Sequence, residues 1–120
     1  MNCCEVCGVP NAELHHIVYR SQAPYMSNIK INFIYLCTEH HRGNLSPHMQ
    51  YKVDLKYKEM LQDKLYEVFR DKRYFDIGEI KEKLKINDTE VKKLTKTLMV
   101  YKEGYKADEI IKHCMGDRFY

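Results

Sequence analysis

The spacing of hydrophobic residues divides the chain near residues 47–51 into two stretches of different character. In the first stretch, short runs of β-branched and aromatic residues predict strands over residues 14–19 and 32–37, with a polar loop between them. Thr38 follows the second run and is expected to cap a short helix. The expected unit is therefore strand, loop, strand and helix.

In the second stretch, apolar residues recur at helical spacing. They predict four helices, over about residues 53–71, 77–84, 91–101 and 110–114. Gly104 and Gly116 are expected to end the last two helices. The predicted fold class is thus α+β, with an N-terminal unit over 1–50 and a small all-helical region over 51–120. Short helices joined by a tight turn are typical of a helix-turn-helix, and also of any small helical bundle.

The length of 120 residues and a hydrophobic content of 44% suit a compact protein with a modest core. No run approaches the ~20 apolar residues that span a bilayer. The first residues, Met-Asn-Cys-Cys-Glu, lack the features of a signal peptide, so a cytoplasmic, reducing location is expected. The net charge of +3 arises from residues 51–120 and is compatible with nucleic acid without being diagnostic of it.

Most candidate chemistry lies in the first 50 residues, where Cys and His side chains are concentrated. Zinc prefers four nitrogen or sulfur ligands in a tetrahedron, and paired ligands separated by two residues are typical of such sites. The pairs Cys4-x-x-Cys7 and Cys37-x-x-His40 fit this pattern, and the predicted hairpin would bring them together. Cys3 is a competing ligand with a less suitable spacing. A structural zinc knuckle is therefore expected.

The other histidines of this stretch, His15, His16, His41 and His48, indicate a second centre. Adjacent strand residues point to opposite faces, so His15 and His16 cannot share one task. One could bind a metal together with His41, and the other could address a water molecule. Hydrolysis of a phosphodiester needs a base, a cation and a group that orients the base. Asn32 could supply the orienting hydrogen bond across the hairpin.

In their order and spacing, these residues resemble the HNH endonuclease family, and most of all its small phage-type members. The stretches that carry the likeness are HHIVYRS at 15–21, Asn32 with the strand after it, and LCTEHHRG at 36–43. The motif covers residues 4 to about 48. The helical tail is also similar to the tails of such phage proteins, with much less specific features.

The resemblance implies a ββα-metal core that cuts DNA with a divalent ion such as Mg²⁺, Mn²⁺, Ni²⁺ or Zn²⁺. It implies that His16 is the general base, that Asn32 fixes and polarises it, and that His15 and His41 hold the catalytic metal. The structural zinc ligands would be Cys4, Cys7, Cys37 and His40. A phage or prophage protein in the host cytoplasm is then expected.

Several assignments stay open at this stage. The knuckle has His40 where the family often has Cys, so His40 and His41 could exchange roles. His48 follows Pro47 and reaches the catalytic metal only if the chain turns back. Arg20 and Arg42 could contact phosphates or be exposed charges near the site.

The lysines of the tail could likewise face DNA or solvent. An alternative function is a non-catalytic zinc-binding regulator that binds DNA or a protein, including a phage packaging or counter-defence factor.

Overall fold

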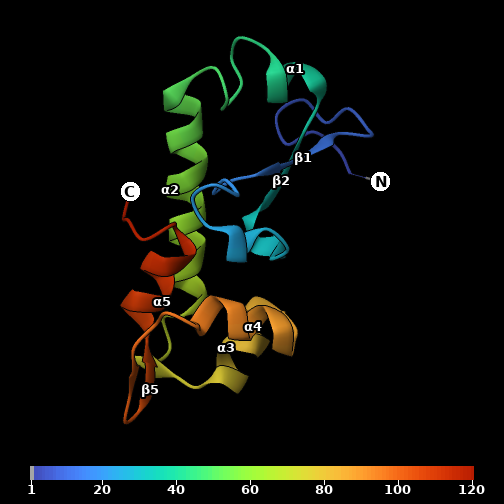
Figure 1. Ribbon diagram of the computed structural model, residues 1–120. Helices are drawn as coiled ribbons and strands as arrows, with labels where there is room; N and C mark the ends of the chain where they lie inside the picture. The colour runs from blue at the N-terminus through green and yellow to red at the C-terminus, as the bar shows by residue number, and fades with distance from the viewer. Residues whose placement is uncertain (1) are drawn as a thin grey trace.

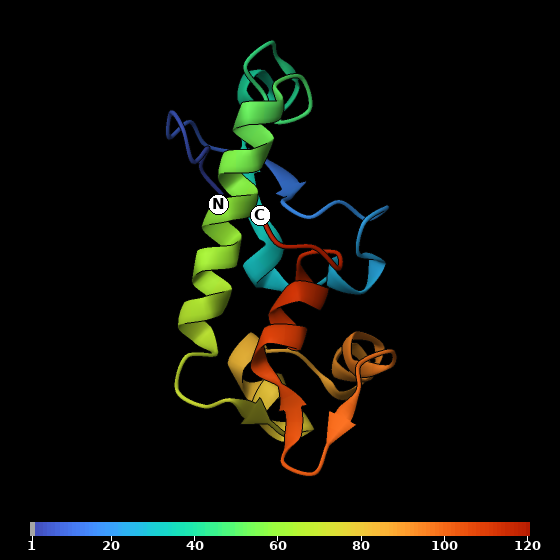
Figure 2. The same ribbon diagram turned by 90° about the vertical axis from the view of Figure 1, so that its left-hand side faces the viewer.

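The computed structural model describes residues 2–120 and is built around one long helix (Figure 1). This helix, α2 (Tyr51–Val68), runs along much of the molecule, which measures 48 × 27 × 25 Å. A β-hairpin with a short helix packs beside its upper half in this view, and smaller helices gather at its lower end (Figures 1 and 2). The predicted helix over 53–71 is thus confirmed, with an earlier start and an earlier end.

The N-terminal unit consists of two antiparallel strands and a helix, as its hydrophobic pattern predicts. Its register pairs Glu13 with Leu36 and His16 with Phe33. The elements are β1 (Glu13–His16), η1 (Pro24–Met26), η2 (Lys30–Asn32), β2 (Phe33–Leu36) and α1 (Thr38–Arg42).

Two boundaries of this unit differ from the expectation. The first strand ends at His16, because the backbone N–H of Val18 turns to the side-chain oxygen of Asn32. Thr38 does not cap α1. Cys37 occupies the cap position, no side chain caps the helix, and Thr38 is its first residue.

The prediction of an all-helical region over residues 51–120 is wrong, because a three-stranded antiparallel sheet lies among the helices. Its strand order is β3-β5-β4. Reciprocal capping hydrogen bonds start two of the helices, between Asp76 and Glu79 and between Asn87 and Glu90. The elements are β3 (Tyr74–Phe75), α3 (Ile77–Leu84), α4 (Asp88–Thr95), β4 (Val100–Tyr101), β5 (Gly104–Lys106) and α5 (Ala107–Cys114).

The helix expected over 91–101 stops at Thr95, and a hairpin takes its place. Gly104 begins β5 with a φ of 126°, where a Cβ atom would lie 2.7 Å from the carbonyl oxygen of Phe75. Only glycine combines this backbone angle with such a close approach. Gly104 therefore fixes the hairpin against β3 instead of ending a helix.

One hydrophobic core joins the two halves of the chain. It includes Ile17 and Leu36 from the N-terminal unit, Leu61 from α2, and Phe75 and Ile110 from the C-terminal region, all of them buried. Among residues 2–120, no helix is both long and apolar enough to cross a membrane.

Candidate metal centres

The first centre brings together Cys4, Cys7, Cys37 and His40. The Sγ atoms of Cys7 and Cys37 are 3.8 Å apart, and Cys4 Sγ lies 3.5 Å from His40 Nδ1. Zinc bonds of about 2.3 Å to sulfur and about 2.0 Å to nitrogen set such tetrahedral edges at ~3.8 Å and ~3.6 Å. Cys3 is exposed and lies outside the group. These four residues could therefore hold a metal such as zinc.

The electrostatics of this group favour a cation. Burial acts to raise the pKa of the Cys4 thiol, but hydrogen bonds with the backbone of Cys37, Cys7 and Val6 lower this pKa to about 6. A hydrogen bond at Val9 lowers the pKa of Cys7, yet burial and the neighbouring thiols raise it overall. Thiolates crowded in this way repel one another, and a bound cation relieves that repulsion.

The second centre unites His15, His41 and His48, whose ligand atoms lie within 4.8 Å of one another. The Nε2 atoms of His41 and His48 face each other at 3.2 Å, close to the ~3.3 Å edge that two imidazoles share on zinc. Nε2 of His15 is buried and has no hydrogen-bond partner within residues 2–120. A buried orphan nitrogen beside two converging imidazoles fits a metal ion.

The surroundings of His15 and His48 favour the neutral imidazole, which is the form that binds a metal. Burial, followed by the charges of His48 and His41, lowers the pKa of His15 to about 4. Burial and then His41 also lower the pKa of His48. The sequence left open whether His48 reaches this group, and the structure places it beside His15 and His41.

Glu13 supports His41 from behind, a contact that the sequence reading missed. Nδ1 of His41 donates to Glu13 Oε1 at 2.8 Å, which leaves Nε2 directed at the other imidazoles. This hydrogen bond, opposed by burial and aided by Arg42, lowers the pKa of Glu13. Carboxylates commonly fix metal-binding histidines in this way. Glu13 lies two residues before His15, at the start of the predicted hairpin. This position is the one feature of the sequence that could have indicated a role beside the histidines.

Arg42 and Arg20 have different surroundings. Arg42 forms an ion pair with Glu13, with a distance of 2.9 Å between Nη2 and Oε2. Arg20 is exposed and lines a hollow of about 280 Å³ together with the three histidines and His16. Arg20 is thus the better placed of the two to meet a phosphate.

His16 lines the same hollow, although its strand neighbour His15 is the metal-group member. Its Nε2 lies 2.9 Å from the carbonyl oxygen of Ser27, and a carbonyl accepts only from a protonated nitrogen. Nδ1 is therefore the basic nitrogen of the neutral ring.

Asn32 does not make the expected hydrogen bond with His16. Its buried side chain accepts from Val18 N at 2.8 Å and donates to Val18 O at 3.0 Å and Met26 O at 3.4 Å. Asn32 thus ties the end of β1 to the loop that carries Ser27, and Ser27 holds His16.

A buried polar network connects the histidines with α2. Tyr19 stacks on His48 with ring centroids 5.6 Å apart, and its hydroxyl donates to Asp54 at 2.7 Å. Lys58 pairs with Asp54 at 2.6 Å and lies 4.1 Å above the Tyr19 ring. The long helix therefore fixes the wall of the histidine hollow.

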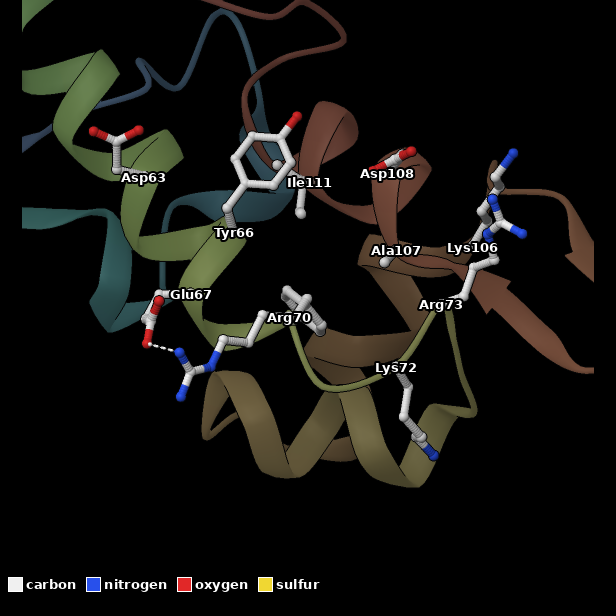
Figure 3. Close-up of a pocket in the computed structure, with 11 residues that line it drawn as sticks. Asp63, Tyr66, Glu67, Arg70, Lys72, Arg73, Lys106, Ala107, Asp108 and Ile111 are labelled. Atoms are coloured by element: carbon white, nitrogen blue, oxygen red, sulfur yellow. Dashed lines mark ion pairs between the residues drawn. The ribbon is translucent and has the colours of Figure 1, made fainter.

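A larger hollow, of about 480 Å³, lies away from both centres, between α2 and α5 (Figure 3). Its charges are mixed, and Arg70 is paired with Glu67 at 3.1 Å. It contains neither Cys nor His.

The two centres define a protein with two Cys/His groups that could each hold a metal ion. Comparison with protein-family models, curated proteins and solved structures finds no match for this chain.

Proposed function

We propose that this protein is a metal-dependent DNA endonuclease of the HNH type. One observation carries the proposal: His15, His41 and His48 converge in a hollow that His16 also lines. A three-histidine group with an open side is typical of catalytic metal sites, where a fourth position is left for water or substrate. A base beside such a site is the arrangement that phosphodiester hydrolysis requires.

In this proposal, His16 removes a proton from the attacking water. Its Nδ1 accepts the proton, while the Nε2–H bond to Ser27 O keeps the ring oriented and supports the charge that it gains. Asn32 acts through the loop backbone, by holding the segment that carries Ser27. A positioned base of this kind contributes about 10²- to 10⁴-fold to the rate.

The residues that would hold the catalytic ion are His15, His41 and His48, with Glu13 orienting His41. When bound, a divalent ion supplies positive charge that stabilises the scissile phosphate and the leaving 3′ oxygen. Arg20, on the rim of the hollow, contributes a further positive charge for a DNA phosphate. Cleavage would leave a 5′ phosphate and a 3′ hydroxyl.

Cys4, Cys7, Cys37 and His40 would hold a structural zinc that forms the knuckle of the N-terminal unit. All four protein ligands are present, which leaves no open position for a substrate. This closed group therefore stabilises the hairpin, and the three-histidine group performs the chemistry.

The test is conversion of supercoiled plasmid with Mg²⁺, Mn²⁺, Ni²⁺ or Zn²⁺ and with a chelator control. Wild-type protein should nick or linearise the plasmid, and His16→Ala should fail to do so while it keeps its zinc and its folded circular dichroism spectrum. Equal cutting by both proteins would exclude His16 as the base. No cutting by wild-type protein with any of these ions, together with tightly held zinc, would favour a non-catalytic zinc-binding regulator instead.

A further inference from the structure

The C-terminal region contains two short helices joined by a three-residue turn and followed by a hairpin, an order of elements typical of helix-turn-helix proteins. Residues 85–87 join α3 to α4 in a tight turn in which Lys85 adopts a φ of 55°. The β4–β5 hairpin follows α4, and α4 lies at the outer edge of the region (Figure 2). In helix-turn-helix proteins, the second helix is the one that approaches DNA.

The exposed side of α4 is basic. Thr89, Lys92, Lys93 and Lys96 are all exposed, and their separations of three and four residues place them on one face. Val91 and Leu94 lie on the other side and are buried. The helix therefore presents three ammonium groups together, away from the core.

Ion pairs distinguish this face from that of α3. Lys81 pairs with Asp88 at 2.7 Å, and Lys83 pairs with Asp71 at 3.0 Å. The three α4 lysines have no acidic partner within 4.0 Å among the residues that the structure describes. The acids of α4, Asp88 and Glu90, lie in its first turn, where Lys92 helps to lower the pKa of Asp88 after the larger effect of Lys81. Lys93 and Lys96 extend the positive charge toward the end of the helix, whereas α3 mixes both signs along its length.

We propose that α4 binds the phosphate backbone of duplex DNA through Lys92, Lys93 and Lys96. Charge complementarity commits the face to a polyanion, and the helix-turn-helix arrangement favours a duplex over a single strand. This inference rests on the proposed function for its substrate, and it adds a second DNA contact outside the histidine hollow.

The contacts of α4 connect it with the N-terminal unit. One side of α4 packs against η1, which lies in the loop between His16 and Asn32. The molecule is 48 Å long, equivalent to roughly 14 base pairs at about 3.4 Å per step. A duplex of about this length would match the long axis of the molecule.

The test compares two pairs of lysines with the same spacing and exposure. Lys92→Ala/Lys96→Ala removes charge from α4, and Lys52→Ala/Lys56→Ala removes it from the exposed side of α2. Binding to a fluorescent 30-base-pair duplex is measured by anisotropy between 50 and 200 mM salt, in the His16→Ala background and without chelator, so that zinc is retained.

Each phosphate contact contributes about −0.9 to the slope of log K against log salt, so the α4 variant should lose about 1.8 from it and bind roughly ten-fold more weakly. The α2 variant should stay within about two-fold of the parent. An unchanged salt slope in the α4 variant would overturn the proposal and would point to a protein partner for this face. Equal losses of DNA affinity in both variants would overturn it too. Failure of the nuclease proposal is seen separately, as absence of plasmid cutting by wild-type protein.

Discussion

The buried ion pair between Lys58 and Asp54 provides a sharp test of how α2 supports the histidine hollow. Both side chains are almost excluded from solvent, at 3% and 11% exposure, and Tyr19 donates a second hydrogen bond to Asp54. Lys58→Met keeps most of the aliphatic volume and removes the ammonium group. The carboxylate of Asp54 then remains buried with one neutral donor.

The expected loss follows from these contacts. Removing one partner of a buried pair typically costs about 3–5 kcal/mol, and the remaining Tyr19 hydrogen bond favours the lower end, about 3 kcal/mol. At roughly 2.1 cal/mol/K per residue, unfolding of 120 residues carries an entropy of about 0.25 kcal/mol/K. The melting temperature should therefore fall by about 12 °C.

Urea denaturation of the zinc-loaded protein, monitored by circular dichroism, measures the change in the free energy of unfolding directly. The double variant Asp54→Asn/Lys58→Met removes both charges and still offers Tyr19 an acceptor, so it should recover at least half of the lost stability. A loss of less than about 1 kcal/mol in the free energy of unfolding of Lys58→Met would refute the reasoning. The buried carboxylate of Asp54 would then not need a charged partner. A double variant no more stable than the single one would refute it too, because the penalty would not reside in the unpaired carboxylate.

Three further predictions concern the metal centres. Glu13→Gln should weaken binding of Ni²⁺ to the histidine group by about 10- to 100-fold in calorimetric titration, because His41 loses its orienting carboxylate. The control Glu39→Gln, exposed on α1, should bind as wild type does, and equal weakening would contradict the orienting role. His48→Ala should abolish Ni²⁺ binding at this group while the zinc content stays at one per chain; unchanged affinity would show that His48 is no ligand. Cys37→Ser should lose zinc and melt at a lower temperature, whereas Cys3→Ser should not, and a Cys37→Ser protein that kept its zinc would exclude this thiol.

The gathering of the Cys and His side chains into two groups could largely be predicted from the sequence, because residue spacing and hairpin geometry are local properties. Two residues between Cys4 and Cys7, and again between Cys37 and His40, suffice to place each pair in one turn. The antiparallel pairing of β1 with β2 then brings the pairs together. The hydrophobic runs predicted both strands for the same local reason.

The supporting contacts were not readable, since each joins residues distant in the chain. Glu13 meets His41 only once the hairpin and α1 are folded, and His16 is held by a backbone carbonyl, which no side-chain pattern reports. The sheet of the C-terminal region was not predicted for another reason. Strands of two or three residues show no alternation, and Leu98 and Tyr101 continue the helical spacing of α4 by coincidence.

Together these contacts explain why the histidine hollow needs the rest of the chain. The hairpin supplies His15 and His16, but the wall that positions His48 is Tyr19, whose hydroxyl is fixed by Asp54 of α2. Because Lys58 neutralises that carboxylate inside the core, the three-histidine group and the long helix form one electrostatic unit. The same helix leads into the C-terminal region that carries α4, and α4 contacts η1 of the N-terminal unit. Loss of the Lys58 charge should therefore lower both the stability of the fold and the Ni²⁺ affinity of the histidine group, whereas loss of the α4 charges should lower neither.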